Sequence, residues 1–141
     1  MISEERIQQE CRTFLWNNYP SSRGFFFHVP NGEKRDPMTG KKLKEMGVLK
    51  GIPDCIYYHP TRQGFKVFHF EFKEPNSGIL SKHQEAIINL YNSVDPNTAF
   101  VVDNIESFKT VINQIHLDHP PYLSEQSKNH QRQYLISLLK K

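Results

Sequence analysis

The sequence predicts an α/β fold in which a mixed central sheet is flanked by helices, with the elements in the order α-β-β-β-α-β-α. Two patterns predict this class. Short apolar runs bounded by Gly, Pro and Asn have the length of strands, whereas three other segments carry apolar residues at helical spacing. A chain of 141 residues can bury one full core but is too short for two ordinary domains.

The first elements are a helix and a strand. Ser3 can cap a helix whose apolar residues recur at helical spacing: Ile7, Cys11, Phe14 and Leu15. Residues 17–24 break that helix, and residues 25–29 have the pattern of a strand, which ends at the turn signal Pro30-Asn31-Gly32. About one helical turn is expected within residues 41–46.

Two strands follow, at residues 53–58 and 65–73, and a hairpin loop at residues 59–64 is expected to join them. In the second strand alternate residues share a face, so Glu71 and Lys73 point to one side. The other side then consists of phenylalanines. This alternation indicates a strand with one face in the core.

The last third of the chain is predicted to alternate again between helix and strand. A helix begins near Ser81, and its apolar face consists of Ile87, Ile88, Leu90, Tyr91 and Val94. Residues 98–102 form a buried strand, and residues 105–115 form a further helix.

Pro120-Pro121 is expected to close the compact domain, because proline cannot continue a helix. Residues 1–119 are therefore predicted to form the domain, and residues 120–141 a C-terminal extension. The extension contains a short amphipathic helix, whose apolar residues are Tyr134, Leu135, Leu138 and Leu139.

Composition narrows the class of protein. A mean hydropathy of −0.64 with 37% hydrophobic residues is typical of a soluble globular protein, and no apolar run is long enough for a membrane span. The acidic N-terminus is unlike a secretory signal. Cys11 and Cys55 lie inside predicted apolar elements, which fits reduced, buried thiols. We expect an intracellular protein, cytoplasmic or viral and acting in a host cell.

Positive charge is concentrated in residues 34–50. This segment holds six cations, Lys34, Arg35, Lys41, Lys42, Lys44 and Lys50, against Asp36 and Glu45, whereas the whole chain has a net charge of only +3. A solvated loop is the simple explanation. Because the segment leads directly into Gly51-Ile52-Pro53-Asp54, its position favours contact with phosphate backbones.

Acidic residues on a hydrophobic sheet suggest chemistry. Asp54 belongs to the apolar strand that Pro53 initiates, and Glu71 shares a face with Lys73 in the next strand. Two carboxylates and an ammonium on one side of a sheet are costly to hold without a function. The arrangement suits a magnesium site with an adjacent lysine, so a nuclease is the first hypothesis.

These residues occur in the order that defines the PD-(D/E)xK nucleases, and the sequence most closely resembles the VRR-Nuc (virus-type replication-repair nuclease) family over residues 3–103. The resemblance is carried by His28-Val29-Pro30-Asn31-Gly32 with Arg35, by Gly47-x-x-x-Gly51-Ile52-Pro53-Asp54, by Glu71-Phe72-Lys73, and by Ser77-Gly78-x-Leu80-Ser81-x-x-Gln84. It implies a restriction-endonuclease-like core, with residues 1–119 as the nuclease domain.

The resemblance also implies an activity. Stand-alone members of the family are homodimeric, structure-selective endonucleases that use Mg²⁺ or Mn²⁺ and cut branched DNA such as four-way junctions. Asp54, Glu71 and the backbone carbonyl of Phe72 are the metal ligands that it implies here. Lys73 would hold the attacking water or stabilise the transition state.

Two further residues are candidates for the site, each with a simpler alternative. Glu4 would supply the acid that this superfamily often takes from its first helix, and its helical phase favours it over Glu5, although acids at a helix start are common. Gln84 would orient the water or touch the phosphate, but Ser81-x-x-Gln84 is also a capping box.

Simpler alternatives exist for the other candidates as well. Asp54 could be a strand-end carboxylate that accepts backbone hydrogen bonds, and Lys73 could form a salt bridge with Glu71 or Glu74. His69 shares the face of Glu71, as a neighbour of the site or as a core histidine. The candidate DNA contacts are Asn31, Arg35, Lys41, Lys42, Lys44 and Lys50, and loop polarity explains several of them almost as well.

Two rival functions remain open. One is a sequence-specific restriction-type nuclease on the same fold, and the other is a nucleic-acid-binding module that has lost catalysis. Zinc ligation lacks a suitable spacing of Cys and His. The sequence contains no phosphate-binding loop and no dinucleotide fingerprint, so we expect neither a nucleotide cofactor nor a membrane partner.

Overall fold

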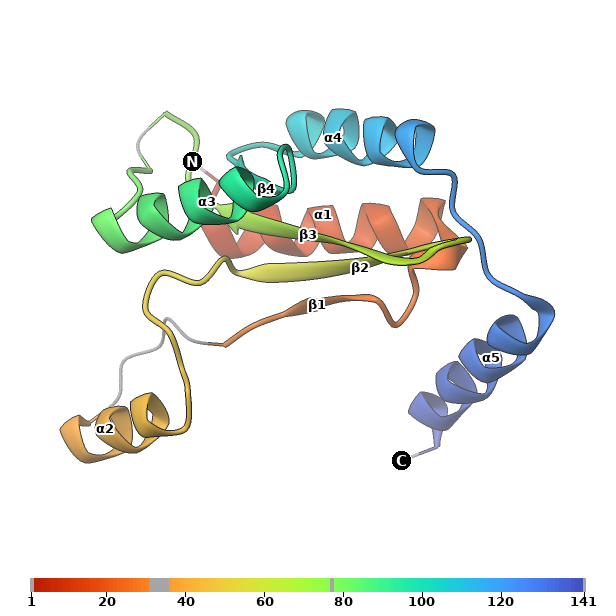
Figure 1. Ribbon diagram of the computed structural model, residues 1–141, viewed down its shortest axis with the longest axis horizontal. Helices are drawn as coiled ribbons and strands as arrows, with labels where there is room; N and C mark the ends of the chain where they lie inside the picture. The colour runs from red at the N-terminus through yellow and green to blue at the C-terminus, as the bar shows by residue number, and fades with distance from the viewer. Residues whose placement is uncertain (1, 31–35, 77, 141) are drawn as a thin grey trace.

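The computed structural model describes residues 2–30, 36–76 and 78–140, so the predicted contacts Asn31 and Arg35 lie outside the described residues. The elements (Figure 1) are α1 (Glu4–Asn18), η1 (Pro20–Ser22), β1 (Phe26–His28), α2 (Pro37–Glu45), β2 (Cys55–Thr61), β3 (Gly64–Phe72), α3 (Lys82–Val94), β4 (Ala99–Val102), α4 (Ile105–Asp118) and α5 (Glu125–Leu139). The predicted mixed sheet flanked by helices is confirmed.

The sheet has the strand order β1-β2-β3-β4. β1 pairs with β2 and β2 with β3 in antiparallel fashion, whereas β3 and β4 are parallel, with Glu71 opposite Val101. A parallel pair needs a long crossover connection, and α3 supplies it. The end of β3 therefore lies in the middle of the sheet, between the start of β2 and the end of β4.

One face of the sheet carries the core. Phe68, Phe70 and Phe72 alternate along β3 and are at most 2% exposed. They pack with Cys11 of α1 and Phe108 of α4, so these two helices cover the same face. Burying a side chain of this size contributes about 1.5–3 kcal/mol. Both cysteines are free and buried, as predicted.

Alternation sends the intervening residues of β3 to the opposite face, which α3 covers. The ring of His69 lies 4.7 Å from that of Tyr91 on α3, and Glu71 contacts Gln84 at the start of the same helix. Ile88 is the buried apolar residue of α3. Glu71 is therefore enclosed between the sheet and α3 and is not on an open surface.

The hairpin between β2 and β3 is tighter than the predicted loop at residues 59–64. Pairing continues to Gly64, which leaves a two-residue turn. The reason is tertiary: His59 is fully buried on the core face, where its ring contacts the hydroxyl of Tyr57 and the backbone carbonyl of His119. A histidine satisfied in this way can occupy a strand, although its polarity favours a loop.

Two helices are longer than expected, and they change the predicted element order. Asp36 caps α2 by accepting from the amide of Thr39 at 2.9 Å, and Pro37 fits the first turn, so α2 has nine residues instead of one turn. Ser124 caps α5 in the same way, and α5 has fifteen residues instead of a short stretch.

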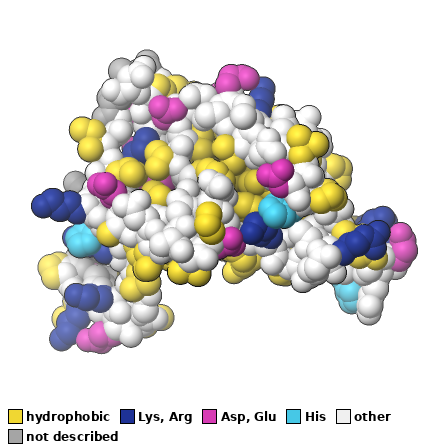
Figure 2. Space-filling view, turned by 45° about the horizontal axis from the view of Figure 1, so that its top comes forward, with side chains coloured by type: hydrophobic (Ala, Val, Ile, Leu, Met, Phe, Trp, Pro, Cys, Tyr) yellow, Lys and Arg dark blue, Asp and Glu magenta, His cyan; other side chains and the backbone are white. Residues whose placement is uncertain are grey.

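Neither of these helices contributes a buried residue. Figure 2 shows lysine side chains gathered over α2, at the lower left of the molecule. α5 lies to one side of the sheet (Figure 1) and is attached by Gln131, whose side-chain amide donates to the carbonyls of Pro20 and Arg23. Within the described residues, no helix is both long and apolar enough to cross a membrane.

Candidate active site

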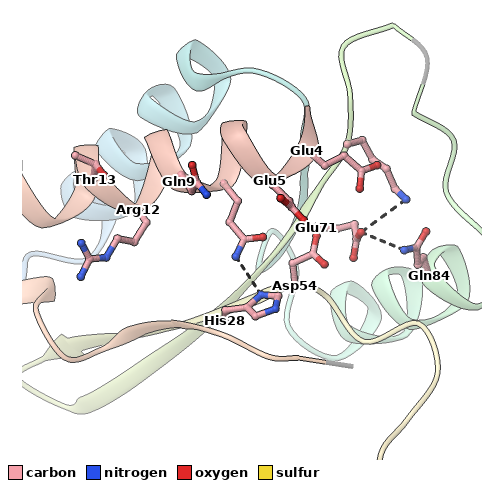
Figure 3. A pocket seen from close by; sticks show the side chains of 11 residues that line it. Glu4, Glu5, Gln9, Arg12, Thr13, His28, Asp54, Glu71 and Gln84 are labelled. Atoms are coloured by element: carbon pink, nitrogen blue, oxygen red, sulfur yellow. Dashed lines mark hydrogen bonds and ion pairs between the residues drawn. The ribbon is translucent and has the colours of Figure 1, made fainter. Parts of the chain in front are cut away.

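A cavity of about 740 Å³ opens where α1, the end of β3 and the start of α3 meet. Its lining brings together five side chains that sequence reasoning selected, namely Glu4, Asp54, Glu71, Lys73 and Gln84. Figure 3 shows the carboxylate of Glu71 between the amide of Gln84 and the carboxylate of Asp54. Residues from four separate segments of the chain thus face one space.

The pairing of β2 with β3 places the two central carboxylates side by side. Cys55 pairs with Phe70, so Asp54, one residue earlier, lies beside Glu71. One oxygen of Asp54 accepts a hydrogen bond from the amide of Phe72 at 2.8 Å. The expected strand-end hydrogen bond is therefore present, and it orients Asp54 toward the cavity.

Glu71 is a buried acid. Its residue is 2% exposed, and its Oε1 is buried without a hydrogen-bond partner among the described residues. Its Oε2 accepts from Nε2 of Gln84 at 3.1 Å. Burial, and then the negative charge of Asp54, raise the pKa of Glu71 well above its ordinary value, against the opposing effect of Lys73. Such a group is stabilised by a cation placed at its free oxygen.

Lys73 follows directly on β3 and is held near this acid. Its Nζ lies 3.8 Å from Oε2 of Glu71, and its side chain is only 11% exposed. The backbone amide of Lys73 donates to the carbonyl of Val102 at 2.9 Å, which extends the parallel pairing by one residue. The predicted salt bridge is thus present, and its ammonium lines the cavity as well.

Gln84 forms the predicted capping box and also contacts Glu71, while its role toward water or phosphate stays a prediction. Its side-chain Oε1 accepts from the backbone amide of Ser81 at 2.9 Å. The backbone amide of Gln84 donates to Oγ of Ser81 at 3.1 Å, which completes the capping box. Its Nε2 remains available and donates to Glu71. The cap therefore fixes the side chain that contacts the buried acid.

Two glycines allow these contacts. A Cβ on Gly51, which has φ +87°, would lie 2.5 Å from the carbonyl carbon of His83, at the start of α3. A Cβ on Gly78 would lie 2.6 Å from Cβ of Lys73. Both glycines occur in the sequence pattern. Only the structure shows that their lack of a side chain lets the backbone pack closely against the start of α3 and against Lys73.

Both acids at the start of α1 line the cavity, so helical phase does not separate Glu4 from Glu5 as expected. Gln8 and Arg12, which lie on the same side of α1 as Glu5, line the cavity as well. The charge of Glu4 is one of the smaller influences that raise the pKa of Glu71. A role for Glu4 as a metal ligand stays a prediction.

The basic residues of α2 lie outside the cavity, and their contact with DNA stays a prediction. None of the described residues that line the cavity comes from α2, so Lys41, Lys42 and Lys44 are separate from the site, and so is Lys50. Sequence reasoning also gave no role to several residues that do line it, namely Gln8, Gln9, Arg12, Thr13 and His28. The spacing of the first four along α1 is the signal that could have indicated them.

No protein-family model matches this sequence, and no curated protein does. Among solved structures, the chain is similar to one described as "VRR_NUC domain protein", with a TM-score of 0.58 and 22% sequence identity. The similarity covers 82% of this chain and 88% of the other. The chain shares the VRR_NUC fold. This confirms the predicted resemblance and fold class, whereas the chemistry must be argued from the residues themselves.

The donor set that the VRR_NUC fold assembles here suits a hard cation. Within the described ranges, no group of three or more His, Cys, Asp or Glu side chains is arranged around a metal-sized space. Two carboxylates, Asp54 and Glu71, converge instead, and Glu71 has an unpartnered oxygen. Mg²⁺ keeps several waters and needs only one or two protein carboxylates, so these residues fit it.

Proposed function

We propose that this protein is a nuclease that hydrolyses DNA phosphodiester bonds with Mg²⁺ or Mn²⁺. The observation that carries the proposal is the convergence of Asp54, Glu71, Lys73 and Gln84 in one cavity, with Glu71 buried and its Oε1 without a partner. Structural salt bridges rarely need a buried acid whose pKa is raised. A bound cation would offset the repulsion between the two carboxylates and favour the ionised form of Glu71, which explains why both acids are held together here.

The cation would be held by the carboxylates of Asp54 and Glu71 with the backbone carbonyl of Phe72, and it would supply a water of lowered pKa and positive charge at the phosphate. Asp54 is oriented by the amide of Phe72. Glu71 is oriented by the amide of Gln84. Both ligands are thus fixed before substrate arrives, which avoids reorganisation during the reaction.

Lys73 provides the second positive group. Its ammonium, which lies 3.8 Å from Oε2 of Glu71, is close enough to the carboxylates to face a phosphate bound beside them. In that place it would hold the attacking water by a hydrogen bond or stabilise the extra negative charge on the pentacovalent phosphorus. The pair is largely buried, and for a buried ion pair the cost of removing both charges from water offsets much of their attraction, so folding alone gives little reason for this lysine.

The finer proposal is that the substrate is branched DNA, such as a four-way junction, and that the active form is a homodimer. Sequence-independent contacts to phosphate backbones favour recognition of shape, and symmetric cutting of a junction needs two sites. α5 carries exposed apolar side chains that a second copy would cover, with Tyr134, Ile136, Leu138 and Leu139 between 45% and 85% exposed. Light scattering of the full chain would test the dimer, and a monomer at working concentrations would contradict it.

Cleavage assays test the proposed function. A labelled four-way junction, a flap, a linear duplex and a single strand are incubated with Mg²⁺, Mn²⁺ or EDTA, alongside Asp54→Ala and Lys73→Ala. We expect metal-dependent cutting of the junction in preference to the duplex, and loss of cutting in both folded variants. Cutting of only certain duplex sequences would indicate a restriction-type enzyme. Binding without any cutting would indicate a binding module.

A further inference from the structure

The cavity extends beyond the carboxylates along one side of α1. Gln9, Arg12 and Trp16 follow one another there at three- and four-residue spacing, and Gln8 lies one turn before Arg12. We call these four residues the α1 stripe. The first three line the cavity. Figure 3 shows Gln9 and Arg12 on this side of α1, leading away from Glu5. The lining therefore changes from acidic near Asp54 and Glu71 to neutral and then basic.

His28 at the end of β1 faces this part of the cavity and offers a hydrogen-bond donor. Its Nδ1 lies 3.0 Å from Nε2 of Gln8. In the tautomer where Nδ1 accepts from the amide nitrogen of Gln8, the ring proton is on Nε2. His28 is exposed, so this N–H is free to donate to an anionic oxygen in the cavity.

At the far end of the stripe, two guanidinium groups pack on one indole ring. The Cζ of Arg12 lies 4.4 Å from the centroid of Trp16, and that of Arg23 lies 5.5 Å from it. Arg23 also donates from Nε to the carbonyl of Trp16 at 3.0 Å. Within the described part of the chain, neither guanidinium has a carboxylate partner. These charges are held in place but not neutralised.

The spacing matches a nucleic-acid strand that leaves the carboxylates. A helix rises 1.5 Å per residue, so Arg12 lies about 10 Å along α1 from Glu5 and Trp16 about 16 Å. A strand of duplex DNA carries one phosphate per about 3.4 Å of helix axis, and its phosphates lie farther apart along the strand itself, so this distance accommodates more than one phosphate. A polyanion with one phosphate at the carboxylate end would meet donors and then cations along the rest of its path.

We propose that the α1 stripe, with His28 and Arg23 beside it, binds the sugar-phosphate backbone of the DNA strand next to the scissile phosphate. The inference rests on the proposed nuclease function and adds a substrate contact to it. In this arrangement His28 and the glutamines donate to phosphates near the reaction centre, and Arg12 and Arg23 contact phosphates farther along. The lysines of α2 contact a separate part of the DNA.

Trp16 makes the inference directly testable, because it is the only tryptophan in the chain. The full chain is titrated in EDTA, which prevents cutting, with an unlabelled duplex and an unlabelled four-way junction. Tryptophan emission is recorded, and the anisotropy of labelled DNA gives the affinity in parallel. We expect the emission of Trp16 to change in proportion to binding, since phosphates draw Arg12 and Arg23 from the ring.

Substitution of Arg12→Gln tests the contact itself. One lost phosphate contact lowers the slope of log K against log salt by about 0.9, which is about an eightfold loss of affinity at 0.1 M salt. The matched control is Arg6→Gln, which removes the same charge from the same helix. Arg6 is paired with Glu10 at 3.1 Å and does not line the cavity, so its replacement should leave the affinity and the slope unchanged.

Two results would overturn the inference while leaving the proposed function intact. In one, DNA that the wild-type protein cuts binds without changing the emission of Trp16. In the other, Arg12→Gln and Arg6→Gln have the same affinity and salt slope. A wild-type protein that neither binds nor cuts any of the DNAs would refute both the inference and the proposed function.

Discussion

Replacement of Glu71 by Gln is expected to stabilise the metal-free protein while abolishing its activity. Burial and the charge of Asp54 raise the pKa of Glu71 from 4.5 to about 8, a value that already includes the attraction of Lys73. One pKa unit corresponds to about 1.4 kcal/mol. At pH 8 the raised pKa of Glu71 therefore lowers the free energy of unfolding by up to about 5 kcal/mol. Because Asp54 shares part of this cost, we expect Glu71→Gln to gain about 2–4 kcal/mol.

The sign of the pH dependence follows from the direction of the shift. A carboxyl group with a raised pKa in the folded state keeps its proton there while the unfolded chain has lost it, so wild-type stability falls as pH rises from about 4.5 to 8. Below pH 4.5, wild type and Glu71→Gln should have nearly equal stability. Above that pH, the difference in free energy of unfolding between Glu71→Gln and wild type should increase steadily.

Urea unfolding at pH 5 and pH 8 in EDTA measures this difference, and the slope with urea checks that both proteins unfold in the same way. The outcome that refutes the reasoning is a Glu71→Gln protein less stable than wild type at pH 8. A stability difference between Glu71→Gln and wild type that is the same at both pH values would also refute it. Either result would mean that Glu71 contributes to stability as a structural salt bridge with Lys73.

Three further predictions test the site and its surroundings. Lys73→Ala should lower the cleavage rate by about 10³-fold or more without unfolding the protein, measured by single-turnover cleavage and circular dichroism. Gly51→Ala should lose about 1–3 kcal/mol more stability than Gly47→Ala, as measured by urea unfolding. Both glycines have positive φ, but only a Cβ added at Gly51 would meet backbone atoms. Burial lowers the pKa of His116 to about 4, so in the Glu71→Gln background stability should fall by about 2 kcal/mol from pH 7 to pH 5. Urea unfolding with and without His116→Gln measures that change, and equal pH slopes would contradict it.

Most of the central site was predictable because it depends on local patterns. The two-residue period of β3 places Glu71 opposite the phenylalanines whatever the neighbouring elements are. The capping box at Ser81 and Gln84 was also visible in the sequence. Its second contact, from Gln84 to Glu71, was left open because it depends on how closely α3 approaches the sheet, and the lack of a side chain at Gly51 decides that distance.

Predictions failed where polarity was taken as a sign of exposure. His59 was assigned to a loop, but partners from β2 and the end of α4 satisfy its ring in the core. Helical phase favoured Glu4 over Glu5, but both acids line the cavity. A polar face of a helix can face either bulk water or a wet cavity, and the pattern along one helix is the same in both cases.

The sequence alone determined the fold class and the buried face of β3, because these follow from periods of 3.6 and 2 residues and from capping residues beside the helices. It also selected Asp54, Glu71, Lys73 and Gln84, since their order resembles a known pattern. Only the tertiary structure decided what these residues meet. Partners such as His28 and Gln8 are twenty residues apart in the chain, and their contact depends on strand register and helix packing, which no local pattern encodes.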